Sequence, residues 1–352
     1  MSEEILIRRE GRAGRITLNR PKALNALTWP MVTAIEEALD AWADDGEVAL
    51  VLIDGAGERA FCAGGDIAEL YRTGRAGDYD YGRRFWRDEY RMNAKLFHFP
   101  KPVVTFLHGF VMGGGVGVGC HGSHRIVCES SVVAMPECGI GLVPDVGGSL
   151  ILARAPGRLG EYLGTTGTRM GPADAIHAGF ADHFVPAADW EGLKAELCAS
   201  GDARAVAAAA KAPGESALAA RQRLVDRHFG GETLGDILRS LRIPTPGEPE
   251  NTAFCEETLK VMARNSPLSM ACTVQIIHRL RGPGATIERA LDLEYRFTAR
   301  AMEKGDFLEG IRAAIIDKDR NPRWRHTLDT LKDYEVTRML MPLPREEKKT
   351  TS

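Results

Sequence analysis

The stretch KPVVTFLHGFVMGGGVGVG, Lys101–Gly119, decides the fold because it joins an apolar run to five glycines within eight positions. Its first half has the continuous apolar composition of a buried strand. Each glycine costs a helix roughly 1 kcal/mol relative to alanine. Five of them therefore indicate close packing or backbone N–H groups kept open to a ligand. The stretch predicts a strand that turns into a short glycine-rich helix.

Strand patterns recur on both sides of this stretch. EILIRREGRAGRITLN (residues 4–19) predicts a hairpin, and VALVLIDGAG (48–57) predicts a buried strand. ERAFCAGGDIAEL (58–70) is interpreted as the loop that follows, and HRIVCESSVVAMPE (124–137) is strand-like again. Strands, glycine-rich turns and helices in this order favour an α/β fold with ligand groups at the strand-to-helix turns.

Helical patterns occupy the remaining segments. They are expected from about residue 28 to 42 and from 81 to 97, and again over most of the chain after Trp190. We therefore expect an α/β core over residues 1–190 and a mainly helical region over residues 191–352, which could also form a homo-oligomer contact. The polar end of the chain, from 342 to 352, is expected to be frayed.

Composition excludes several classes of protein. The 352 residues are 44% apolar and 26% charged, with a net charge of −3. Nucleic acids and anionic membranes are bound by clustered positive charge, so neither is expected as a partner. Seven cysteines without C-x-x-C spacing are typical of a reducing compartment, and no apolar run approaches the roughly 20 residues that cross a bilayer. These features predict a cytoplasmic protein.

The segment FCAGGDI, Phe61–Ile67, places Ala63, Gly64, Gly65 and Asp66 between a buried strand and a helix. Backbone N–H groups at a helix start are free to donate, and glycine lets a ligand approach them. One interpretation is a tight turn. The other is a binding site for an oxyanion, which commonly uses two N–H donors; the glycine-rich helix would supply the second.

Two carboxylates stand out in AMPECGIGLVPDVGG, Ala134–Gly148, because Lys and Arg are both absent from this window. Glu137 follows an apolar strand, where an unpaired carboxylate is costly. Asp145 follows a proline and could be an ordinary turn residue. Either the two acids face water or they line a cleft in which they have a chemical task.

These three glycine- and acid-bearing segments, in this order and spacing, resemble the enoyl-CoA hydratase/isomerase (crotonase) superfamily. More narrowly, they resemble its 3-hydroxyisobutyryl-CoA hydrolase branch. The segment DFLEGIRAAIIDKDRNPRW, Asp306–Trp324, is similar to the same branch, so the resemblance covers nearly the whole chain. It implies a core of repeated ββα turns, a helical C-terminal region and an acyl-CoA substrate. The reaction implied is a thioester hydrolysis of valine catabolism that needs no metal or other cofactor.

The resemblance also implies roles for individual residues. The N–H groups of Gly65 and Gly114 would hold the thioester oxygen, with Ala63, Gly64 and Asp66 beside them. The hydrolases use three carboxylates, which fall on Glu89, Glu137 and Asp145. By itself, Glu89 could equally be one member of an ion pair, since its helix also carries Arg83, Arg84, Arg87 and Arg91.

One difference separates the branches by chemistry. Hydratases need two glutamates around the double bond, and the first matches Gly117 here, which has no side chain. Asp145 takes a position where hydratases usually have glycine. The rearranged acids favour attack at the thioester carbon over addition of water to a double bond. An enoyl-CoA hydratase or isomerase is the alternative, and a non-catalytic acyl-CoA-binding protein is a third hypothesis.

Other conspicuous residues have simpler interpretations. His108, His121 and His124 lack partners at metal-ligand spacing, so packing or surface roles are expected. Cys62 and Cys138 are expected to pack as small residues. Arg20, Lys22 and Lys101 are candidates for contacts with the phosphates of the ligand, and each could equally be ordinary surface charge.

Overall fold

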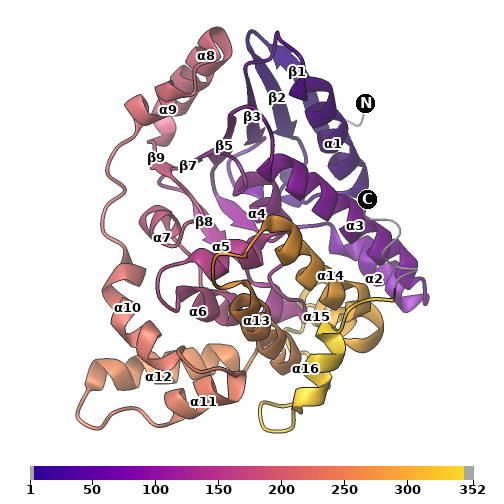
Figure 1. The fold of residues 1–352 in the computed structure, drawn as a ribbon, viewed down its shortest axis with the longest axis vertical. Coiled ribbons are helices and arrows are strands. Elements are labelled where there is room, and N and C mark those ends of the chain that lie inside the picture. The colour runs from indigo at the N-terminus through magenta and orange to yellow at the C-terminus, as the bar shows by residue number, and fades with distance from the viewer. Residues whose placement is uncertain (1–3, 345–352) are drawn as a thin grey trace. The chain divides into compact units, whose positions relative to one another are not determined.

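The computed structural model describes residues 4–344, which form two compact units (Figure 1). The first takes in the chain up to Asp66, then Asp88–Ala134 and Arg169–Ala219. The second takes in Ile67–Arg87, Met135–Thr168 and the chain from Ala220 onward. The predicted boundary near residue 190 falls inside the first unit and stays a prediction. The polar end beyond residue 344 lies outside the described residues.

The first unit is built on a six-stranded sheet with the order β1-β2-β3-β5-β7-β9. Its strands are β1 (Ile5–Glu10), β2 (Ala13–Leu18), β3 (Leu50–Gly55), β5 (Val103–Leu107), β7 (His124–Val127) and β9 (His183–Phe184). β1 and β2 pair antiparallel, which confirms the predicted hairpin, and the other neighbours are parallel. Gly11, between β1 and β2, has φ +57°, a conformation that glycine adopts without strain.

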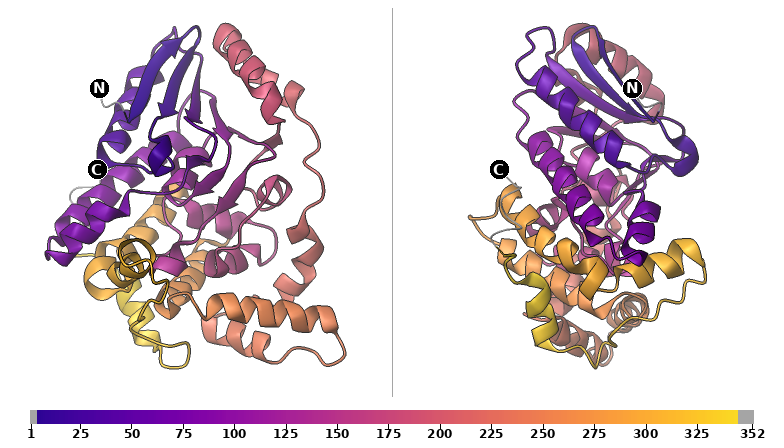
Figure 2. Two further views of the ribbon diagram at one scale, coloured as in Figure 1. Left: turned by 180° about the vertical axis from the view of Figure 1, so that it is seen from behind. Right: turned by 90° about the vertical axis from the view of Figure 1, so that its right-hand side faces the viewer.

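Helices cover both faces of this sheet (Figure 2). Ala13 belongs to the core cluster that includes Trp190 and Leu193 of α8 (Trp190–Ser200), with α9 (Arg204–Ala209) beside it. Its neighbour Gly14 lies against the ring of Trp42 on α1 (Trp29–Ala43). Because successive residues of a strand point to opposite faces, α1 and α8 lie on opposite sides of the sheet.

A second, parallel sheet follows the first along the chain, with the order β4-β6-β8. Its strands are β4 (Ala60–Cys62), β6 (Phe110–Met112) and β8 (Val132–Ala134). Each comes after a strand of the large sheet and leads into a helix: α2 (Ile67–Arg75), α4 (Gly114–Gly119) and the 3₁₀ turn η2 (Glu137–Ile140). This is the repeated ββα arrangement that the resemblance implied.

The short strands required two corrections to the sequence interpretation. The predicted loop 58–70 contains β4 and the beginning of α2, and the strand-like segment 124–137 is two strands, β7 and β8. A strand of three residues is too short to show a periodic pattern. The break in the second segment is a turn at Ser131, whose hydroxyl accepts the N–H of Cys128 and donates to the carbonyl of Leu107.

The regular elements of the second unit are all helices within its described residues. Besides α2, η2 and the first part of α3 (Tyr79–Phe97), it contains α5 (Gly148–Arg154), α6 (Leu159–Thr166), most of α10 (Ala217–His228), α11 (Leu234–Arg242), α12 (Pro249–Met262), α13 (Pro267–Leu280), α14 (Ile287–Lys304), α15 (Phe307–Ile311), the π-helix η4 (Arg312–Ile316) and α16 (Asp333–Leu340). The remaining elements, η1 (Pro21–Ala23), α7 (Pro172–His177) and η3 (Ala187–Asp189), belong to the first unit.

Helix α13 forms the core of the second unit. It is buried along most of its length and packs against α5, α6, α14 and α16. Ser266 caps its start by accepting the N–H of Ser269 at 3.2 Å, and Pro267 follows in the first helical position, where its missing N–H costs nothing. None of the helices between residues 4 and 344 is long and apolar enough to cross a membrane.

Candidate active site

Gly65 and Gly114 come together in the first unit. Gly65 lies in the loop after β4, and Gly114 is the first residue of α4. A Cβ atom added to Gly114 would lie 3.3 Å from the backbone N of Gly65 and 3.1 Å from Oε1 of Glu89. The two strand-to-helix turns therefore bring their backbones, and one carboxylate, to a single point. We call Gly65, Gly114 and Glu89 the donor site.

The N–H groups of the donor site are open. Neighbouring N–H groups are engaged: Ala63 donates to the carbonyl of Leu24 at 3.0 Å, and Asp66 donates to that of Leu27 at 2.8 Å. Among the described residues, the N–H groups of Gly65 and Gly114 have no acceptor. Gly64, which immediately precedes Gly65, has φ +120°, which only glycine adopts readily. Two open N–H donors side by side can hold a developing oxyanion.

Two other glycines of α4, Gly115 and Gly119, serve close packing. A Cβ on Gly115 would lie 2.2 Å from the carbonyl oxygen of Cys62, and one on Gly119 would meet the side chains of Leu107 and Phe61 within 3 Å. These contacts press α4 against β4 and β5. The cost of glycine in a helix is therefore explained by packing at Gly115 and Gly119, and by access to the N–H group at Gly114.

Glu89 does not form a solvent-exposed ion pair. Its side chain is buried, with 3% of the residue exposed. Arg91, two residues further along α3, pairs with Glu36 at 2.6 and 2.7 Å and with Asp88 at 2.9 Å, and Asp88 also accepts the indole N–H of Trp29. The carboxylate of Glu89 lies beside Gly114.

In the second unit, Glu137 is a buried acid with an unsatisfied oxygen. It begins η2 and is 4% exposed, and its Oε2 has no hydrogen-bond partner. Burial, together with repulsion from Asp145 and Glu294, raises the pKa of Glu137 well above its usual value. Leaving a buried polar atom unpaired costs about 1–3 kcal/mol. A carboxyl group kept in this state is a candidate base or nucleophile.

Asp145 is held in a strained turn. It is buried, and its carbonyl accepts the N–H of Gly148 at 2.7 Å. The two residues between them are left-handed, with φ +52° at Val146 and +78° at Gly147. A β-branched residue in this region costs on the order of 1–3 kcal/mol and persists only where its surroundings fix it.

A third buried acid, Glu294 on α14, was missed by the sequence interpretation. It is fully buried and accepts the N–H of Gly147 at 2.9 Å and that of Ser149 at 3.2 Å, as well as the hydroxyl of Ser149. Burial and the charge of Asp145 raise its pKa to about 8. Its partners are about 147 residues away in the chain, so no local pattern could have revealed it. Glu137, Asp145 and Glu294 are called the acid cluster below.

Of the three candidate phosphate contacts, only Lys22 has an open side chain. Lys101 Nζ donates to the carbonyls of Trp42 and Asp45 at 2.6 and 2.7 Å, a role within the fold. Arg20 pairs with Asp66 at 2.9 Å and with Glu4. Lys22 is exposed and has no side-chain partner among the described residues.

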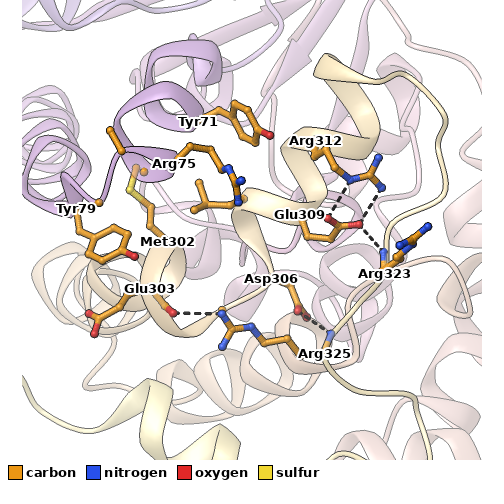
Figure 3. Close-up of a pocket in the computed structure, with 15 residues that line it drawn as sticks. Tyr71, Arg75, Tyr79, Met302, Glu303, Asp306, Glu309, Arg312, Arg323 and Arg325 are labelled. Atoms are coloured by element: carbon orange, nitrogen blue, oxygen red, sulfur yellow. Dashed lines mark hydrogen bonds and ion pairs between the residues drawn. The ribbon is translucent and has the colours of Figure 1, made fainter.

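A polar cavity of about 660 Å³ lies within the second unit, between the end of α2 and the segment from α14 to residue 325 (Figure 3). Arg312 is engaged by Glu309, and the guanidinium of Arg325 donates to the carbonyl of Glu303. The guanidinium groups of Arg75 and Arg323 form no hydrogen bond or ion pair within residues 4–344. The cavity can therefore accept an anionic group.

The cysteines and histidines singled out in the sequence show packing roles at Cys62, Cys138, His108 and His124. Burial raises the pKa of both Cys62 and Cys138 to about 12, so neither thiol is a ready nucleophile. His108 is partly buried, which lowers its pKa, and the imidazole of His124 stacks on that of His183. Within the described residues, no group of three or more His, Cys, Asp or Glu side chains could hold a metal ion.

Comparisons with known proteins agree with this architecture. The enoyl-CoA hydratase/isomerase family matches residues 13–340. The mitochondrial 3-hydroxyisobutyryl-CoA hydrolase of Rattus norvegicus is 39% identical over 92% of this chain and 84% of its own. A probable 3-hydroxyisobutyryl-CoA hydrolase of Arabidopsis thaliana is 36% identical over 98% of this chain and 93% of its own.

Two solved structures share the whole fold. A crystal structure from Rhodobacter sphaeroides, described as an enoyl-CoA hydratase, is 57% identical with a TM-score of 0.90, covering 97% of this chain and 98% of its own. One from Mycobacterium thermoresistibile, described as a carnitinyl-CoA dehydratase, is 41% identical with a TM-score of 0.90, covering 97% of each chain.

Proposed function

This chain belongs to the enoyl-CoA hydratase/isomerase family, and we propose that it is a 3-hydroxyisobutyryl-CoA hydrolase, which converts its substrate and water into 3-hydroxyisobutyrate and coenzyme A. Relatives with this printed activity match it over more than nine-tenths of its length. The observation that carries the choice of hydrolysis is the buried pair of acids, Glu137 and Asp145, together with the absence of a side chain at Gly117.

In the proposed reaction, the thioester oxygen accepts hydrogen bonds from the N–H groups of Gly65 and Gly114. Negative charge grows on this oxygen when the carbonyl carbon is attacked, so both bonds strengthen in the transition state. One such donor is typically worth about 10²–10³ in kcat. The open N–H groups of the donor site support this step.

Glu137 has one of two roles in this proposal. As a nucleophile, its carboxylate attacks the carbonyl carbon and expels the thiolate of coenzyme A, and water then hydrolyses the mixed anhydride. As a general base, it takes a proton from the water that attacks the same carbon. Both routes need Glu137 ionised, and Asp145 and Glu89 orient the substrate hydroxyl, the water or Glu137 itself.

A second candidate function, hydration of an enoyl-CoA, is favoured by the description of the Rhodobacter sphaeroides structure. Hydration needs two acid groups near the double bond, one to position and ionise the water and one to exchange the second proton. At the position that matches the first hydratase glutamate, α4 carries Gly117, a buried residue without a functional group. This difference favours hydrolysis.

The test compares the two reactions on one enzyme preparation. Free thiol released from 3-hydroxyisobutyryl-CoA measures hydrolysis, and loss of the enoyl absorbance of crotonyl-CoA measures hydration. We expect thiol release to dominate and to be lost in Glu137→Gln. Rapid hydration of crotonyl-CoA without thiol release would overturn the proposal, and tight binding of both thioesters without turnover would favour a non-catalytic binding protein.

Two further points follow from the proposed activity. The acid that it produces places the reaction in the breakdown of valine. A cytoplasmic location remains a prediction, since the rat relative is named as a mitochondrial protein.

A further inference from the structure

We propose that Glu294 is a positioning residue for the hydrolysis: it holds the turn that carries Asp145, and so fixes where the Asp145 carboxylate stands. The inference rests on the proposed function. Glu294 lies on α14, far from Asp145 in the chain, yet both of its carboxylate oxygens are bonded to this turn. Oε2 accepts from Gly147, and Oε1 accepts from the backbone and hydroxyl of Ser149.

The turn needs such a partner because its own conformation is unfavourable. Val146 follows Asp145 directly and has φ +52°, which crowds a β-branched side chain. A hydrogen bond from the N–H of Gly148 to the carbonyl of Asp145 closes the turn. The N–H groups on either side, at Gly147 and Ser149, are the two that Glu294 accepts. Glu294 thus fixes the residues immediately after Asp145.

The charged side chains on neighbouring helices do not explain why a carboxyl group is buried at position 294. α14 packs against α5, α13, α15 and α16, and their charged side chains include Arg154, His278, Arg279, Glu309 and Glu335. Three of these side chains form hydrogen bonds with groups other than Glu294: Arg154 with the carbonyl of Ala285, His278 with Glu161, and Glu309 with Arg312. Within residues 4–344, Glu294 forms no ion pair with a Lys, Arg or His side chain, and its hydrogen-bond donors are Ser149 and the backbone of Gly147.

A buried acid without a cationic partner is costly for the fold, and a purely structural turn could be held by a neutral side chain. A carboxyl group offers two oxygens as acceptors where an amide offers one, and here the two oxygens bind two successive parts of the turn at once. A displacement of about 1 Å in an active site can cost on the order of 10² in rate, so a rigid turn beneath Asp145 serves catalysis directly.

The experiment measures kcat and KM for thiol release from 3-hydroxyisobutyryl-CoA in wild type, Glu294→Ala and Glu294→Gln, with the folded fraction of each sample measured by circular dichroism. We expect Glu294→Ala to lose about 10² in kcat per folded molecule, with KM within about threefold. The kcat of Glu294→Gln should be at least tenfold higher than that of Glu294→Ala, since the amide oxygen of Gln still accepts one N–H of the turn. Asp292→Asn, an exposed acid on the same helix, is the matched control and should keep wild-type kcat.

If wild type is active and Glu294→Ala has the same kcat per folded molecule, the positioning role of Glu294 is wrong, while the proposed function stands. Wild-type protein that releases no thiol would overturn the proposed function first. Should Glu294→Ala not fold, Ser149→Ala removes only the hydroxyl bond to Glu294. It should lower kcat severalfold at unchanged KM, and wild-type kcat in this variant would overturn the inference.

Discussion

The donor site and the acid cluster are built by opposite means. The donor site, in the first unit, consists mainly of backbone: two N–H groups exposed by glycines at strand-to-helix turns. The acid cluster, in the second unit, consists of side chains: Glu137 and Asp145 come from one segment, and α14 brings Glu294 to them from a distant part of the chain. Backbone donors cannot be removed by simple substitution, only obstructed. Side-chain acids can be removed singly, so each kind of site fails in a different way.

A second contrast lies within the second unit, between Glu137 and Glu161. Both are buried acids. Burial alone would raise the pKa of Glu161, but hydrogen bonds from His278 and Arg281, both at 3.0 Å to its Oε1, lower it to about 2. Glu137 has no such cation and an acid beside it, and its pKa is raised. The protein neutralises the buried acid that supports its fold and leaves the proposed catalytic acid uncompensated.

The largest expected effect is that of Glu137→Gln, which removes the proposed base or nucleophile while keeping its shape. We expect kcat for thiol release to fall roughly 10³-fold or more. Because the folded state raises the pKa of Glu137, it binds this proton more tightly than the unfolded state does, so Glu137 makes stability fall as pH rises above about 4.5. The variant should therefore be more stable than wild type at alkaline pH.

Urea unfolding at several pH values and a thiol assay check both parts of this prediction. Near-normal turnover would remove Glu137 from the mechanism. If stability depends on pH in the same way in wild type and variant, folding does not raise the pKa of Glu137.

Gly114→Ala obstructs the donor site without changing any acid. Its methyl group would stand 3.3 Å from the N of Gly65, in the space that the thioester oxygen is proposed to enter. We expect about a 10²-fold loss in kcat with little change in melting temperature. Gly192→Ala is the matched control, since a Cβ at that exposed position meets nothing within 4 Å. Equal activity of the two variants would contradict the donor site.

These first two variants also show what the sequence could reveal. The glycine-rich turns were visible in the sequence as places with a local backbone requirement, and the family resemblance singled out Gly65 and Gly114 within them. Glu137 and Asp145 were visible as acids without basic neighbours in the same segment. Their roles in catalysis stay predictions, as does the pairing of the donor site and the acid cluster on one substrate.

Other features depended on packing that no local pattern encodes. Glu294 belongs to an ordinary amphipathic helix in the sequence and meets the Asp145 turn only through the fold. Lys101 was predicted as either a phosphate contact or ordinary surface charge, whereas its ammonium group donates to two carbonyls at the end of α1. Strand β4 has three residues and shows no alternation, so it was interpreted as loop.

Asp145→Asn tests the coupling inside the acid cluster. Burial is the main cause of the raised pKa of Glu137, and the charge of Asp145 is the next. Removing a like charge lowers the pKa of the remaining acid. We expect kcat to fall roughly 10–100-fold and the acidic limb of kcat/KM, set by ionisation of Glu137, to move to lower pH. A limb that stays in place or moves to higher pH would contradict the coupling.

Glu161→Gln should affect stability and leave catalysis unchanged. Its loss breaks the bonds to His278 and Arg281 and should lower the free energy of unfolding by about 1–3 kcal/mol, with wild-type kcat at low temperature. Because the pKa of Glu161 is depressed when folded, its contribution is complete above about pH 4.5 and is lost as pH falls toward about 2. Acid titration of unfolding should therefore be shallower in the variant. A large loss of kcat in Glu161→Gln would contradict the prediction that Glu161 supports the fold and not the reaction.

The most direct test of the account is the infrared spectrum of a ¹³C-labelled thioester carbonyl of 3-hydroxyisobutyryl-CoA bound to Glu137→Gln. This variant should keep the substrate intact, and two N–H donors should shift the carbonyl band to lower frequency than in water. Adding Gly114→Ala should abolish most of that shift. Rapid hydrolysis by Glu137→Gln, or a bound carbonyl band at its position in water, would contradict the claim that the backbone donors and the buried acid act on the same thioester.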